Sequence, residues 1–170
     1  MLSGVVVVVA AGNSGYVTLN ASQSDVTRFS AAITINDPGN AENAITVGST
    51  HRDAPHTNGI SFFSSRGPTG DGRPKPDLVA PGERIMSAAG GQHLKDIQRA
   101  QFPGYSPAAY IEDSGTSMAA PHVSGANAAF LSVQREYVGK PDDMKIRLTS
   151  SGLPTYSRCT DRNAAMTPDT

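Results

Sequence analysis

A long stretch without charge constrains this sequence more than any other feature. Residues 114–134 contain no Asp, Glu, Lys or Arg, and Ala, Gly and Ser predominate among them. A helix of this composition is expected to be buried almost all round and packed closely against its neighbours. Pro121 cannot donate a hydrogen bond to the carbonyl of Ser117, and a helix tolerates this only near its start. The sequence therefore predicts a core helix with Ser117 at its amino end.

Ser117 has two interpretations at this position. Its hydroxyl could cap the helix, because serine oxygens satisfy the free backbone donors of a helix start. Alternatively, the hydroxyl could be a nucleophile, since the same N–H groups stabilise negative charge that develops beside them. The local sequence leaves both interpretations open.

Short apolar segments rich in β-branched residues precede this helix. Residues 5–10 (VVVVVA) are predicted to form a fully buried strand followed by a turn, and residues 44–50 a second buried strand. Weaker strands are predicted at residues 59–65, at 77–80 before Pro81-Gly82, and at 83–88. Helical signals lie at residues 141–152, and around 94–100 within the irregular segment 90–107.

This order of elements indicates an α/β fold with a largely parallel sheet and flanking helices. Ligands of such folds bind at the carboxyl ends of strands, where residues 10–15 (AAGNSG) lie. This Gly-rich segment fits neither the G-x-G-x-x-G nor the G-x-x-x-x-G-K-[ST] phosphate-binding pattern. Nucleotide binding is therefore not expected.

Composition excludes several classes of partner and site. The 170 residues, 38% hydrophobic and 17% charged, are typical of a single folded domain. A net charge of -1 predicts neither nucleic-acid nor anionic-membrane binding. The single cysteine, Cys159, excludes an intrachain disulfide and a cysteine-based zinc site. No apolar run approaches the roughly 20 residues of a membrane helix, and no basic residue precedes residues 4–11 as in a signal peptide.

Three motifs resemble those of one enzyme family. Residues 115–122 (GTSMAAPH) look like the nucleophile motif of the subtilisin-like serine proteases, the subtilases or peptidase S8 family, and residues 10–15 resemble their oxyanion-hole segment. Residues 63–82 are similar to the stretch between those motifs in many larger members. The motifs occur in the family's order, so the chain resembles the carboxyl-terminal portion of a subtilase catalytic domain.

This resemblance implies roles for particular residues. Ser117 would be the nucleophile, and its backbone N–H together with the side-chain amide of Asn13 would donate to the oxyanion. Ala10, Ala11 and Gly12 would form one wall of the pocket for the P1 side chain. The alternative for Asn13 is a turn residue that tolerates a left-handed backbone.

The family's catalytic Asp and His motifs have no counterpart in these residues, and they precede the oxyanion asparagine in subtilases. We therefore expect residues 1–152 to be the carboxyl-terminal portion of the catalytic domain, with its sheet incomplete on the amino-terminal side. His122 is too far around a helix from Ser117 to act as its base, and is expected to be structural. His51, His56 and His93 are expected to be solvated. Residues 153–170 form a tail without a clear family counterpart.

The remaining expectations concern cofactors, partners and location. The resemblance implies no cofactor for catalysis, although subtilases often bind structural calcium. Asp71 and Asp77 make a poor calcium cage, because Arg73 and Lys75 lie between them. The resemblance implies protein or peptide substrates, with a propeptide or a missing amino-terminal segment as partner. It also implies a secreted or extracytoplasmic protein. The alternative function is a non-catalytic subtilase-like module for binding or assembly, or an inactive fragment.

Overall fold

The computed structural model describes residues 4–20, 26–55, 59–101, 103–104 and 110–152. In chain order its elements are β1 (Val8–Ala10), β2 (Tyr16–Asn20), β3 (Val26–Ser30), β4 (Ile45–His51), β5 (Leu78–Glu83), β6 (Ile85–Ala88), α2 (Gly91–Gln101), β7 (Tyr110–Asp113), α3 (Thr116–Val133), the 3-10 helix η1 (Arg135–Tyr137) and α4 (Pro141–Ser151).

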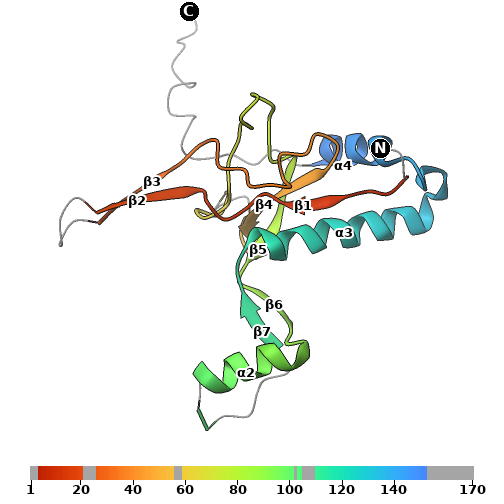
Figure 1. Cartoon of the computed structure of the whole chain (residues 1–170). Coiled ribbons are helices and arrows are strands. Elements are labelled where there is room, and N and C mark those ends of the chain that lie inside the picture. Colours follow the sequence, from red (N-terminus) through yellow and green to blue (C-terminus); the bar gives the residue numbers. More distant parts are fainter. Residues whose placement is uncertain (1–3, 21–25, 56–58, 102, 105–109, 153–170) are drawn as a thin grey trace, which may run out of the picture.

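A three-stranded parallel sheet forms the centre of the molecule. Its strand order is β1-β4-β5, and the middle strand β4 is the second buried strand that the sequence predicts. Helix α3 runs along this sheet (Figure 1). The core consists of apolar residues from β4, β5 and α3: Ile45, Val47, Ala80, Ala119 and Val123. The predicted α/β class, with a parallel sheet and flanking helices, is confirmed.

Strand β1 lies at an edge of this sheet. The expectation of a fully buried strand over residues 5–10 is wrong, because pairing covers only Val8–Ala10, and Val5 and Val7 are 56% and 42% exposed. β1 pairs with β4 on one side alone. The backbone groups on its other edge therefore have no strand partner among the described residues.

Helix α3 is buried on one side only. Its buried residues are Thr116, Ala119, Val123 and Asn127, which follow the three-to-four spacing of one helix face. Val133, by contrast, is 76% exposed. The expectation of burial almost all round is thus wrong for the described residues, because the sheet contacts a single face of the helix. Small uncharged side chains permit close packing, but burial also requires another element that packs against them.

Two of the weaker strand predictions are wrong in detail. Residues 59–65 form turns and one isolated bridge, Thr50 with Ile60, instead of a strand. Two serines of this segment are hydrogen-bonded to Ser49 of β4. The Ser61 N–H donates to the Ser49 carbonyl at 2.8 Å, and the Ser49 N–H donates to Ser64 Oγ at 3.0 Å. Strand β5 does not stop at Pro81-Gly82 as predicted but continues to Glu83. An edge strand tolerates a proline whose missing N–H would face away from the neighbouring strand.

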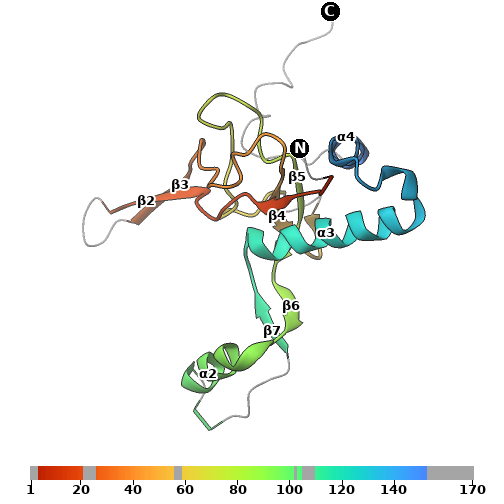
Figure 2. The same ribbon diagram turned by 45° about the vertical axis from the view of Figure 1, so that its right-hand side comes forward.

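Two arms project from the body in both views (Figures 1 and 2). One is the antiparallel hairpin of β2 and β3, and the other consists of antiparallel β6 and β7 with α2 between them. Helix α2 extends beyond the helical signal predicted around residues 94–100 at both ends. The second arm leaves the body beside the start of α3.

The carboxyl-terminal helix agrees with the sequence. Helix α4 spans Pro141–Ser151 with Gly152 as its C-cap, so the prediction at residues 141–152 is confirmed. None of the helices in the described ranges is long and apolar enough to cross a membrane. His56, Cys159 and the tail of residues 153–170 lie outside the described residues.

Candidate functional site

The AAGNSG segment continues directly from β1 and is held by backbone hydrogen bonds on two sides. The Ala11 N–H donates to Val47 O at 2.9 Å, and the Asn36 N–H donates to Ala11 O at 3.0 Å. The Ser65 N–H donates to Gly12 O at 2.9 Å. Bonds from three different segments therefore fix the path of the chain up to Asn13.

Gly12 is required at its position. Its φ of 106° is a conformation that side chains other than hydrogen disfavour. A Cβ there would lie 2.7 Å from Cγ of Asn36 and 2.9 Å from Oγ of Ser65. Any larger residue at position 12 would displace the segment that leads into Asn13.

Helix α3 begins immediately before Ser117. Gly115 is the N-cap and makes no side-chain capping bond, Thr116 is buried, and Ser117 is the exposed second residue of the helix. The interpretation of Ser117 as the cap residue is therefore wrong. The start of the helix carries the positive end of its dipole, so it favours a negative charge beside Ser117.

The side chain of Asn13 is fastened to this helix start. Its Oδ1 accepts hydrogen bonds from the Thr116 N–H at 3.0 Å and from Thr116 Oγ1 at 3.1 Å. The same Thr116 hydroxyl accepts from the Gly12 N–H at 3.1 Å. Because Oδ1 is occupied as an acceptor, Nδ2 is left as the donor of the amide group.

Asn13 is not a left-handed turn residue. Among the described residues, only Ile33 and Arg84 combine a side chain with a positive φ, so that interpretation is wrong. Nδ2 of Asn13 also lies 3.3 Å from where a Cβ on Gly115 would stand. The structure therefore brings Asn13 and Ser117, far apart in the chain, to one helix start, beside the segment of Ala10, Ala11 and Gly12.

The described histidines have other partners. Nδ1 of His122 lies 2.8 Å from the Met118 carbonyl on its own helix, as expected of a structural residue. Nδ1 of His51 accepts a hydrogen bond from the Asp53 N–H at 3.2 Å. His56 and the side chain of His93 are outside the described part of the chain.

Asp71 is engaged by a basic side chain. Its carboxylate accepts from Nε of Arg73 at 2.8 Å and from the hydroxyl of Thr69. The hydrogen bond from Arg73, followed by that from Thr69, lowers the pKa of Asp71 from 3.8 to about 2. This carboxylate is thus committed to a surface turn.

Asp77 is the acceptor of a largely buried ion cluster. Its two oxygens lie 2.6 Å from Nζ of Lys75 and 3.0 Å from Nζ of Lys145, and the Thr46 N–H donates to it at 2.7 Å. Burial lowers the pKa of Lys75, and the bond to Asp77 opposes that shift. The described residues contain no group of three or more acidic, His or Cys side chains able to hold a metal. Asp77 instead ties β4 and β5 to α4.

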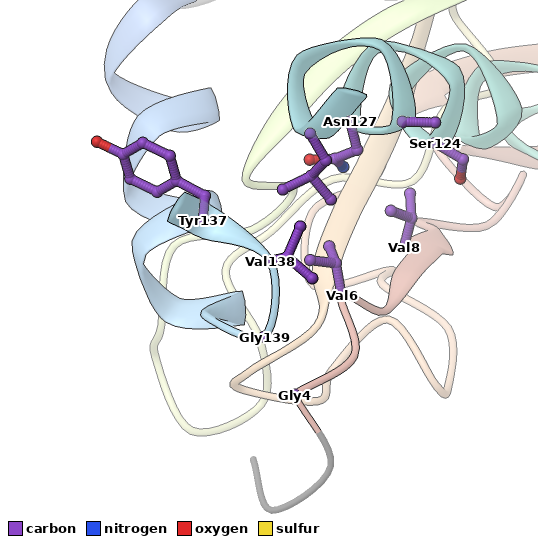
Figure 3. A pocket seen from close by; sticks show the side chains of 10 residues that line it. Gly4, Val6, Val8, Ser124, Asn127, Tyr137, Val138 and Gly139 are labelled. Atoms are coloured by element: carbon purple, nitrogen blue, oxygen red, sulfur yellow. The ribbon is translucent and has the colours of Figure 1, made fainter. Parts of the chain in front are cut away.

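An apolar groove lies further along α3, away from Ser117. It has a volume of about 290 Å³, and Val6, Val8, Leu131 and Val138 are among its lining residues (Figure 3). Asn127 also lines it, 4% exposed, and neither amide atom of this side chain has a hydrogen-bond partner among the described residues. The groove begins about two helical turns beyond Ser117, so it is separate from the candidate site.

Comparison with known proteins decides the family. The model of the subtilase family, peptidase S8, matches residues 1–164. The chain belongs to the subtilase family. The serine protease AprX of Bacillus subtilis (strain 168) is 35% identical to this subtilase over 147 residues, which cover 84% of the chain and 29% of AprX.

Solved structures agree with this assignment. A cold-adapted subtilisin-like serine proteinase matches with a TM-score of 0.51 and 29% identity, covering 83% of this chain and 36% of that one. Sphericase matches with a TM-score of 0.58 and 27% identity, covering 86% of this chain and 39% of its own. The subtilase chain therefore spans well under half the length of these relatives.

Sequence reasoning missed Thr116 as part of the site. Its hydroxyl accepts from the Gly12 N–H and donates to Oδ1 of Asn13. Thr116 lies in the motif GTSMAAPH, directly before Ser117. Its position next to the candidate nucleophile was the available signal. The partner of its hydroxyl was not predictable, because Gly12 and Asn13 are distant in the chain.

Proposed function

We propose that the protein containing this subtilase chain is a serine endopeptidase that hydrolyses peptide bonds through an acyl-enzyme on Ser117. The observation that supports this most strongly is the attachment of Asn13 to the start of α3. Thr116 holds Oδ1 of Asn13 through two hydrogen bonds, at 3.0 and 3.1 Å, one residue before Ser117. A preorganised amide donor beside a serine at a helix start suits acyl transfer.

In the first step, Ser117 Oγ bonds to the carbonyl carbon of the substrate and loses its proton to a general base. The substrate oxygen becomes an anion that accepts hydrogen bonds from the Ser117 N–H and from Nδ2 of Asn13. The C–N bond then breaks, and the leaving amine takes the proton from the base. Water attacks the resulting ester in the same way and releases the acid, restoring the Ser117 hydroxyl.

The general base is proposed to be a histidine, oriented by an aspartate, from the part of the catalytic domain that precedes these residues. This follows the family resemblance, in which both motifs come before the oxyanion asparagine. His122 does not replace this histidine, because it lies five residues beyond Ser117 on α3, about 140° around the helix, and a base must be within hydrogen-bond reach of the hydroxyl. No metal or other cofactor takes part in these steps.

Ala10, Ala11 and Gly12 are proposed to form a wall of the P1 pocket. Ala10 and Gly12 are partly exposed and would face the P1 side chain, whereas Ala11 is fully buried and would support the wall from behind. Backbone hydrogen bonds hold Ala11 and Gly12 in a defined path, so the wall is rigid. Proteins or peptides are the proposed substrates. We keep secretion as the expected location on the basis of family resemblance alone.

The test is peptide hydrolysis by the complete protein and by its Ser117→Ala and Asn13→Ala variants. Ser117→Ala should abolish hydrolysis while the thermal unfolding midpoint stays close to that of the wild type, because alanine suits a helix. Asn13→Ala should lower kcat much more than it raises KM, since an oxyanion donor acts on charge that develops in the transition state. Near-normal turnover by Ser117→Ala would refute the proposal, and an inactive wild type would favour a non-catalytic module.

A further inference from the structure

The turn between β5 and β6 has an unusual backbone. Arg84, which links Glu83 to Ile85, has a φ of 59°, in the left-handed region that disfavours residues with a Cβ. Such a conformation persists only where the surroundings hold it. Residues 82–85 are called the Arg84 turn below.

Both polar groups of the Arg84 peptide backbone are held by side chains. The Arg84 N–H donates to Oγ of Ser114 at 2.9 Å, and the Arg84 carbonyl accepts from Nη1 of Arg52 at 2.6 Å. The two guanidinium groups also meet one carboxylate, because Glu112 lies 3.3 Å from Nε of Arg84 and 3.9 Å from Nη1 of Arg52. The turn is therefore fixed to β7 on one side and to the end of β4 on the other.

The same turn is in direct contact with the residue that caps α3. The Gly115 N–H donates to the Gly82 carbonyl at 2.7 Å. A Cβ on Gly82 would lie 2.7 Å from the Gly115 carbonyl and 2.9 Å from Cβ of Ala119, so the two backbones approach as closely as glycine allows. Ser114 and Gly115 thus both contact the turn, and the next residues are Thr116 and Ser117.

From these contacts we propose that Ser114 and Arg52 are positioning residues for the nucleophile. Through the Arg84 turn they fix Gly115, and thereby the place of Ser117 relative to Asn13. This inference rests on the proposed function, and neither Ser114 nor Arg52 belongs to the nucleophile or oxyanion-hole motif. Neither side chain needs to touch the substrate.

A positioning role follows from where the two proposed oxyanion donors, Nδ2 of Asn13 and the Ser117 N–H, are attached to the fold. Asn13 comes from the end of β1, whereas the Ser117 N–H belongs to α3, so their separation depends on how the helix start is held. Thr116 fastens the helix to Asn13, and the Arg84 turn fastens the residues before it to β5. Sites of this kind need geometry within about 0.5 Å, and a misplacement of about 1 Å can cost roughly 100-fold in rate.

The first experiment uses the complete protein and the variants Ser114→Ala, Ser114→Thr and Ser132→Ala. Ser114→Ala should lower kcat about 3- to 10-fold, the range that corresponds to one net hydrogen bond, with KM within about twofold of the wild type. Ser114→Thr keeps the hydroxyl and should restore kcat. Ser132→Ala is the matched control, because that exposed hydroxyl donates to the Ala129 carbonyl near the far end of α3 and has no other partner within the described ranges.

All rates are divided by the concentration of sites titrated with a fluorophosphonate, so that unfolded molecules do not count. A merely structural role would lower the number of titrated sites and leave kcat per site unchanged, and that result would overturn the inference. A rise in KM at constant kcat would also overturn it.

The second experiment combines Arg52→Ala with Ser114→Ala. Because both side chains hold the same peptide unit of Arg84, the loss of kcat in the double variant should be smaller than the product of the two single losses. Fully multiplicative losses would show that the residues act independently and would refute the shared turn. An inactive wild type would refute the proposed function itself, whereas an active wild type with an unchanged Ser114→Ala variant would refute only this inference.

Discussion

Replacing Thr116 by valine removes one hydroxyl and little volume, so it tests how Asn13 is held. In the structure this hydroxyl donates to Oδ1 of Asn13 and accepts from the Gly12 N–H, each at 3.1 Å. Thr116 is 1% exposed, so water cannot readily replace the lost group. Asn13 keeps its bond to the Thr116 N–H at 3.0 Å, and the Gly12 N–H loses its acceptor.

The expected magnitude follows from these contacts. An unsatisfied, partly buried donor costs about 1–3 kcal/mol, which is the expected loss in the free energy of unfolding. The variant also loses one of the two hydrogen bonds that orient Asn13. A net hydrogen bond is worth about 1 kcal/mol, so kcat should fall roughly fivefold. The effect should therefore stay well below the 10²–10³-fold loss associated with removing the corresponding asparagine of subtilisin.

The assay compares Thr116→Val with Thr116→Ser in the complete protein, by peptide hydrolysis and by urea unfolding. Thr116→Ser keeps the hydroxyl and should lie close to the wild type in both measurements. The reasoning would be refuted if Thr116→Val kept both wild-type kcat and wild-type stability, because the hydroxyl would then not orient Asn13.

Three further results are expected. Gly12→Ala should lower both stability and kcat, measured by unfolding and hydrolysis, because its Cβ would lie 2.7 Å from Cγ of Asn36; a fully active variant would contradict this. Asp71 should contribute stability that is present above pH 3.8 and lost as the pH falls to about 2, since its folded pKa is lowered. Over that pH range the free energy of unfolding should fall less steeply in Asp71→Asn than in the wild type, and equal slopes would contradict the role of Asp71. Residues 1–170 expressed alone should be inert and should aggregate through the exposed edge of β1; a soluble, hydrolytically active chain would contradict this.

The sequence predicted the elements whose signals are local. Strand β4 is a short β-branched run, and α4 begins with proline and two acids. Helix α3 has Ser117 at its amino end, as the nearby Pro121 indicates, although Pro121 itself lies inside the helix. In each case backbone preference and burial favour the same structure. The relation of Ser117 to Asn13 was inferred from motifs, and spacing alone could not have indicated it.

What the sequence did not predict depends on contacts between distant residues. The hairpin of β2 and β3 was missed because neither YVTLN nor VTRFS is a continuous apolar run of the kind that marks a buried strand. Tyr16, Val17 and Phe29 are each more than a third exposed. Residues 59–65 are β-prone, yet their serines bond to β4 and turn the chain. The exposure of one side of α3 could not be predicted. The composition of a helix indicates which of its side chains can be buried, but not whether another element packs against them.

The most direct test of the central claim is covalent labelling of Ser117. The complete protein is treated with a fluorophosphonate serine probe, and the modified peptide is identified by mass spectrometry. We expect a single label on Ser117, slowed strongly by Asn13→Ala and absent in Ser117→Ala, because the serine needs both activation and a stabilised oxyanion. A folded protein that remains unlabelled, or one labelled at another serine, would contradict the assignment of Ser117 as the nucleophile.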